Sequence, residues 1–152
     1  MMKKLLTILF FSLFTHATLT ATTPYNLEGL KSLNILILDL SDAIPLSLET
    51  KLAHDLKKEL EANGIKTTKD GVGAMFVKMT TIKQKNSAVV YITLGVGEEG
   101  IIHRGKGIES FVVTYNYDDM IETNKLEEDV YDSVINFLLE EFLEQFHEDN
   151  DI

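Results

Sequence analysis

AMFVKMTTIK, residues 74–83, and AVVYITLGV, residues 88–96, are two apolar runs joined by the polar stretch QKNS. In both runs the apolar side chains fall on every second residue. Such alternation is typical of strands with one face on a core and the other in water. The pair therefore predicts an antiparallel hairpin that turns at residues 84–87.

A third strand is expected after this hairpin, from Ile108 to Asp118. Its alternation places four residues on one face, namely Phe111, Val113, Tyr115 and Tyr117. The segment between the strands, Gly97 to Gly107, is rich in glycine and polar residues, so we expect a loop there.

On the N-terminal side of the hairpin, Leu33 to Leu40 is a nearly continuous apolar run. Continuous runs indicate a strand covered on both faces. A helix should follow, capped by Ser47 and ended by Asn63-Gly64, because glycine accepts the left-handed conformation at a helix C-terminus. Its apolar stripe comprises Leu48, Leu52, Leu56 and Leu60. A short strand is expected near residues 65–68.

The C-terminal part of the chain predicts the clearest helix. Asn124 with Glu127 resembles a capping box. The expected apolar face comprises Leu126, Val130, Val134, Phe137, Leu138, Phe142 and Phe146. Acidic residues near the end (Glu140, Glu141, Glu144, Glu148 and Asp149) oppose the helix dipole. This end either frays into a solvated tail or meets a basic partner.

These elements together predict an α+β fold in a single domain. The order is β-α-β-β-β-α, with a mostly antiparallel sheet and two helices packed on one of its faces. Two helices on one face are the economical way to bury the apolar side of such a sheet.

The N-terminus has the three parts of a secretory signal. Lys3-Lys4 precede an apolar run of about ten residues, and small residues lead to a cleavage position at Ala21. We expect residues 1–21 to be a signal peptide and residues 22–152 to form one periplasmic or secreted domain. An uncleaved N-terminal anchor is the alternative. The chain has no cysteine, which excludes a lipidated cysteine and structural disulfides.

The charge balance is strongly acidic. The chain has 24 Asp and Glu against 14 Lys and Arg, and loss of the two lysines in residues 1–21 takes the formal charge from −10 to −12. Such a surface repels phosphate backbones and anionic lipid headgroups. We therefore expect no nucleic-acid partner and no stable membrane insertion after signal cleavage.

Motifs that would carry chemistry are weak. Residues 95–100 match G-x-G-x-x-G, but no helix is expected to follow, so we interpret the match as a flexible hairpin loop. The histidines at 54, 103 and 147 lack a metal-ligand spacing. Asp39 and Asp42 follow the first strand, where they form turns or caps more often than ligand sites. We expect no catalytic residue, metal or cofactor.

The best candidate for binding is the basic cluster His103, Arg104 and Lys106. It lies between glycines on an otherwise acidic protein, and cations at a loop tip can receive a carboxylate or an acidic partner. The alternative is a solvated tip that keeps an exposed hairpin soluble.

The export signal, the element order and the segment from Thr50 to Ile65, TKLAHDLKKELEANGI, resemble a loose group of periplasmic α/β domains. The group includes the TolB amino-terminal domain, the lipopolysaccharide-assembly lipoprotein LptE and auxiliary lipoproteins of ABC transporters. What its members share is a helix that ends at a glycine and leads into a strand. This chain departs from the lipoproteins because it lacks the lipidated cysteine.

Three functions are considered, in order of preference. The first is a non-catalytic domain that binds an envelope protein, as an accessory in envelope assembly or transport. The second is a small-ligand binder with a pocket near Tyr115 and Tyr117. An enzyme comes third, since it would need an acid/base site that the sequence does not reveal.

Overall fold

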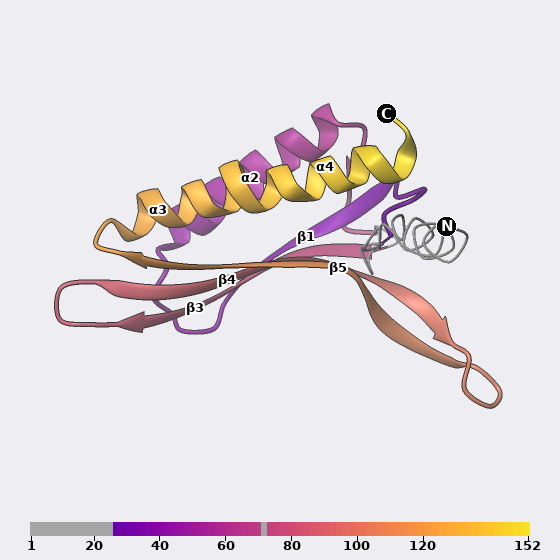
Figure 1. The fold of residues 1–152 in the computed structure, drawn as a ribbon, viewed down its shortest axis with the longest axis horizontal. Coiled ribbons are helices and arrows are strands. Elements are labelled where there is room, and N and C mark those ends of the chain that lie inside the picture. The colour runs from indigo at the N-terminus through magenta and orange to yellow at the C-terminus, as the bar shows by residue number, and fades with distance from the viewer. Residues whose placement is uncertain (1–25, 71–72) are drawn as a thin grey trace, which may run out of the picture.

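The computed structural model describes residues 26–70 and 73–152 (Figure 1). The expected signal peptide, residues 1–21, lies outside them. The strands are β1 (Ser32–Asp39), β2 (Lys66–Thr67), β3 (Gly73–Lys83), β4 (Ala88–Ile102) and β5 (Ile108–Thr123). The helical elements are α2 (Leu46–Ala62), α3 (Leu126–Asp132), the π-helical turn η1 (Ser133–Leu138) and α4 (Leu139–Asn150). This order confirms the predicted α+β fold with two helices, since α3, η1 and α4 follow one another directly.

All five strands form one sheet in the order β2-β1-β3-β4-β5. β1 pairs in parallel with β2 and β3, whereas the β3–β4 and β4–β5 pairs are antiparallel. Both helices lie on the same side of this sheet (Figure 1). The mixed but mostly antiparallel sheet and its one-sided helix layer therefore agree with the sequence.

Helix α2 begins two residues earlier than predicted. Pro45 occupies the N-cap position with an extended backbone, and its carbonyl accepts hydrogen bonds from the amides of Leu48 (2.9 Å) and Glu49 (3.2 Å). Ser47 lies inside the first turn, so its prediction as the cap was wrong. The fixed φ of proline prepares the chain for the helix without a side-chain cap. The predicted stop is confirmed, because Gly64 has a φ of +84°.

The second helix buries five residues that are spaced four apart: Val130, Val134, Leu138, Phe142 and Phe146. A regular α-helix takes 3.6 residues per turn, so this spacing would drift about 40° at each step. The wider turn of η1 offsets part of the drift and keeps the stripe on the sheet. Within the described ranges, no helix is long and apolar enough to cross a membrane.

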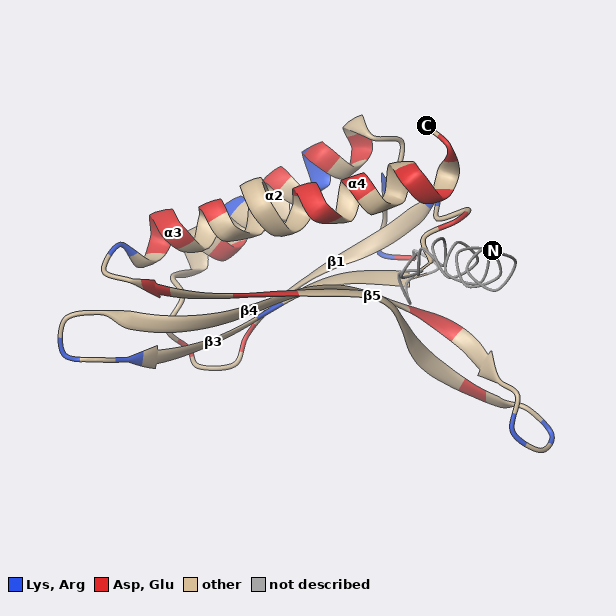
Figure 2. Cartoon of the chain, viewed as in Figure 1, with Lys and Arg blue, Asp and Glu red and all other residues tan. Residues whose placement is uncertain are grey.

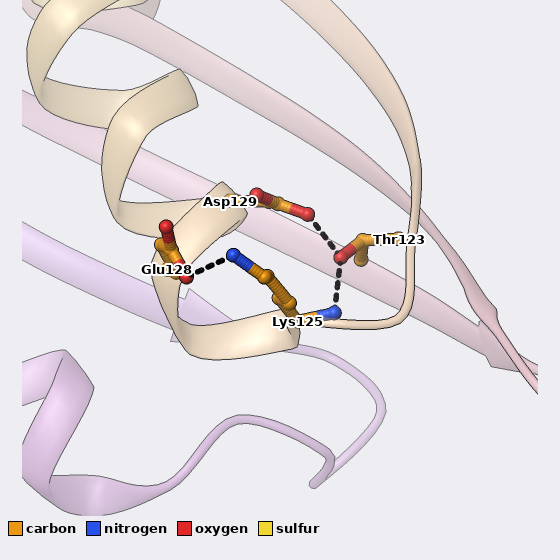
Figure 3. A network of polar contacts seen from close by, with 4 residues as sticks. All are labelled: Thr123, Lys125, Glu128 and Asp129. Carbon is orange, nitrogen blue, oxygen red and sulfur yellow. Dashed lines mark hydrogen bonds and ion pairs between the residues drawn. The ribbon is translucent and has the colours of Figure 1, made fainter.

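The N-cap residue of this helix is Lys125 and no side chain caps it, so the capping box predicted at Asn124 and Glu127 was wrong. The Thr123 hydroxyl accepts a hydrogen bond from the Lys125 amide at 2.7 Å and donates one to the Asp129 carboxylate (Figure 3). Lys125 also pairs with Glu128 at 3.0 Å. The network joins the end of β5 to the first helical turn, so the helix direction is set by the strand before it.

The acidic end of α4 does not fray, which was one of its two expected forms, and contact with a basic partner stays a prediction. Helix α4 continues to Asn150, and the Asp149 carboxylate accepts a hydrogen bond of 2.8 Å from the Leu27 amide. Asn150 accepts the Gly29 amide at 2.8 Å and donates to the Leu27 carbonyl at 3.0 Å. The end is therefore ordered by the segment that precedes β1.

We expect Asp149→Ala to release this segment and to cost about 1–2 kcal/mol, because it leaves the Leu27 amide without its acceptor. Amide hydrogen exchange is the measurement, with faster exchange expected at Leu27. Glu148→Ala is the matched control, since Glu148 is exposed and adjacent. Equal protection of Leu27 in both variants would contradict the assignment.

Candidate functional site

The sheet face opposite the helices carries apolar side chains. Leu36 and Leu38 are 40% and 41% exposed there, whereas Ile35 and Ile37 pack against the core on the other side. β1 is thus covered on one face only. Within a single copy of the chain, the prediction of a strand covered on both faces was therefore wrong. We call this side the open face and define it by Leu36, Leu38, Phe76, Tyr91 and Met120.

Two glycines on β4 are each in close contact with an aromatic ring from a neighbouring strand. A Cβ added to Gly95 would lie 2.4 Å from the Phe76 ring, and one added to Gly97 would lie 2.1 Å from the Phe111 ring. A ring can therefore lie flat against the strand only where the strand has no side chain. Gly97–Ile102 is part of β4, so the loop predicted from Gly97 to Gly107 was wrong over its first half.

A β-bulge in β5 changes which side chains share a face. Val96 pairs with Tyr115 but Gly97 pairs with Val113, so Thr114 is an extra residue. Tyr115 therefore joins the helix side with Val96, whereas Val113 and Phe111 lie on the side of Gly97. The prediction of a single face from Phe111 to Tyr117 was wrong, because a bulge shifts the alternation by one residue.

β4 and β5 continue past the end of the sheet as a two-stranded arm, residues 99–111. The last β3–β4 pair is Gly73 with Glu98, and beyond it the two strands pair only with each other. The arm bends away from the helix layer (Figure 1). Ile101, Ile108 and Phe111 are 62%, 52% and 59% exposed on it. The Phe111 ring lies against Gly97 at the base of the arm, whereas Ile101 and Ile108 lie farther out, beyond the body of the domain.

The predicted binding residues His103, Arg104 and Lys106 lie together at the tip of the arm, and all three are exposed. The tip is a tight turn, in which the Arg104 amide donates to the Ile102 carbonyl at 2.8 Å and both Gly105 and Gly107 have positive φ. Neither Arg104 nor Lys106 forms an ion pair with another residue in the described ranges, 26–70 and 73–152. Their binding role stays a prediction.

Charge is distributed unevenly over the molecule. After Lys125 the chain has ten acidic residues and no lysine or arginine, and these acids line the helix layer (Figure 2). The blue residues at the tip of the arm lie on the opposite side of the sheet. The cationic tip is thus separated from the anionic layer by the length of the arm.

The region proposed for a ligand pocket is filled by its own side chains. Tyr115 is buried and meets the Phe142 ring edge-on, with 5.3 Å between centroids, and Tyr117 lies 5.9 Å from Phe137. This packing argues against a pocket at these tyrosines.

A hollow of about 590 Å³ lies elsewhere, between the start of α2 and α3. Lys51 lies 3.6 Å above the Tyr131 ring in its wall, and the Tyr131 hydroxyl donates to Asp55 at 2.8 Å. The hydrogen bond to Asp55 raises the pKa of Tyr131. The charges of Lys51 and Asp55 are thus already engaged within the chain.

The strand-end aspartate Asp39 forms a turn, as predicted. Its carboxylate accepts the amides of Ser41 (3.0 Å), Ala43 (2.6 Å) and Ile44 (2.7 Å) and the Ser41 hydroxyl (2.7 Å). His147 lies 2.9 Å from the Asn63 side chain. Within the described part of the chain, no three His, Asp or Glu side chains converge as metal ligands would.

No protein-family model matches this sequence, and no curated protein matches it. The resemblance to periplasmic α/β domains therefore stays a prediction that rests on the pattern of residues 50–65 and on the element order.

Proposed function

We propose that the protein is an exported, non-catalytic domain that acts by binding another protein, as an accessory in envelope assembly or transport. The observation that carries the proposal is the arm. A two-stranded ribbon is marginally stable without further strands, yet this one carries Ile101, Ile108 and Phe111 into solvent. Exposed apolar side chains next to charged ones are typical of interaction sites.

The tip supports a partner that is acidic where it meets the arm. Arg104 can bind a carboxylate through two parallel hydrogen bonds, and Lys106 adds a second positive charge. The apolar sides of the arm would supply most of the binding energy, and the cations would fix the register and the orientation. An envelope partner is part of the proposal because residues 1–21 have the pattern of a secretory signal.

Charge reversal at the tip tests the proposal. We expect Arg104→Glu/Lys106→Glu to reduce capture of a specific envelope protein by about tenfold or more, because like charges then face each other. Capture from envelope extract of the source organism is quantified by mass spectrometry for wild type and variants. Lys57→Glu/Lys58→Glu on α2 changes the net charge equally and should capture that protein as wild type does. Identical captured proteins for all three chains would refute a role for the arm.

A further inference from the structure

The open face has the composition of a buried surface. Leu36 and Leu38 are two-fifths exposed on β1, and Met120 is 70% exposed on β5. Phe76 and Tyr91 lie between them on β3 and β4. β1 has the near-continuous apolar sequence of a strand with cover on both sides, whereas the elements described cover one side only (Figure 1).

We infer that a second copy of this chain covers the open face, so that two sheets pack face to face around a two-fold axis that runs along β4. The inference concerns a different surface from the arm tip and stands whether or not the tip binds a partner.

Lys78 and Asp118, two charged residues near the middle of the open face, are complementary about this axis. Lys78 pairs across the sheet with Thr93, and Thr93 pairs with Asp118, so the three form one row. At about 4.8 Å between strands, the Cα atoms of Lys78 and Asp118 lie about 10 Å apart. Among the described residues, neither side chain takes part in an ion pair. A two-fold axis along β4 reverses the row in the second copy. Lys78 then faces the second copy's Asp118, and the pair occurs twice.

The remaining charge distribution favours the same arrangement. Asp118 is held toward the face by a hydrogen bond of 2.7 Å from the Thr93 hydroxyl. Most acidic residues lie on the helix layer (Figure 2). When the two sheets pack face to face, the two helix layers lie on the outer sides of the dimer. With layers about 10 Å thick, the helix layers are about 30 Å apart, several Debye lengths at physiological salt. Contact through any helix surface would bring these acids together instead.

The face is large enough for a stable dimer. β3 and β4 pair over eleven residues, and four strands are about 20 Å wide, so the face spans roughly 700 Å² in projection. Stable interfaces bury about 800 Å² per partner. The arm leaves the sheet at one end and bends toward the side of the open face (Figure 1). A two-fold axis along β4 therefore brings the two arms next to each other beyond the end of the central strands.

Sedimentation velocity on the protein obtained by expressing the full chain tests the inference. We expect a concentration-dependent dimer. Lys78→Asp and Asp118→Lys should each raise its dissociation constant by about tenfold or more, because the contact becomes repulsive. The double variant Lys78→Asp/Asp118→Lys should return to within about threefold of wild type, since the row is then only reversed. Lys58→Asp on α2 is the control and should leave the dimer unchanged.

Three outcomes would overturn the inference: a monomer at every concentration, a dimer insensitive to both charge reversals, or a double variant as weak as the single ones. Cross-linking gives an answer that does not depend on these charges. The chain has no cysteine, so Tyr91→Cys introduces a unique thiol next to the axis. A bifunctional maleimide that spans about 10 Å should link it to its counterpart. Linkage of Lys58→Cys instead would place the contact on the helix layer.

Discussion

Phe142→Ala is expected to lower the free energy of unfolding by about 3–5 kcal/mol, the largest stability loss that we predict for a single substitution in this chain. Phe142 is fully buried between the second helix and the sheet. Its ring meets Tyr115 edge-on at 5.3 Å and Phe146 at 6.4 Å. Truncation removes the apolar area and both ring contacts, and it leaves a cavity that neighbouring helix residues fill only in part.

Urea denaturation at a fixed protein concentration measures this loss, since a dimer would make stability depend on concentration. Phe137→Ala is the matched control on the same helix. Phe137 is 40% exposed and contacts Tyr117 at the rim, so we expect a loss of about 1 kcal/mol or less. A loss of similar size in the two variants would mean that Phe142 does not anchor the helix layer.

The core could be predicted because its signals are local. Val90, Ile92, Leu94 and Val96 alternate regularly in sequence, and all four are fully buried. The α2 stripe and its glycine stop follow equally simple periodicities. Elements of this kind require only the spacing of apolar residues, which a single sequence displays directly.

The arm could not be predicted, because its signals point the other way. Glycines between Gly95 and Gly100 indicate a loop in most sequences, but here Gly95 and Gly97 make room for rings that come from other strands. The bulge at Thr114 also leaves no signal in the sequence, since apolar residues alternate without a break at Phe111, Val113, Tyr115 and Tyr117. Both features depend on residues far apart along the chain. The position of the basic cluster at a tip could nevertheless be predicted, because charged residues between glycines can be recognised from the sequence alone.

The open face shows how one sequence pattern can have two interpretations. The apolar run of β1 predicts cover on both faces, and within one copy the helices supply only one of them. The apolar pattern predicts that both faces of the strand are buried, but it does not identify the chain that buries the second face. The dimer proposed above would reconcile the pattern with the fold.

Asp39→Asn is expected to cost about 2–3 kcal/mol at neutral pH. The Asp39 carboxylate accepts three backbone amides and one hydroxyl in the turn between β1 and α2. An asparagine has a single acceptor oxygen, so at least one amide loses its partner and faces the new NH₂ group. Hydrogen bonds to a charged group contribute about 1.5–3 kcal/mol each. Asp42→Asn is the matched control, because Asp42 is exposed in the same turn and its φ of +51° suits asparagine.

The pH dependence of this loss identifies its cause. Burial raises the pKa of Asp39, but hydrogen bonds from Ile44, Ser41 and Ala43 outweigh it, so the pKa lies below its usual value. A depressed pKa means that the charged form is stabilised in the folded protein. This contribution is complete above the unfolded pKa of about 3.9 and is lost as the pH falls through the folded value. In urea denaturation, the difference between wild type and Asp39→Asn should therefore be constant near neutrality and shrink below about pH 4. A difference independent of pH down to the acid transition would assign the loss to packing rather than to the carboxylate.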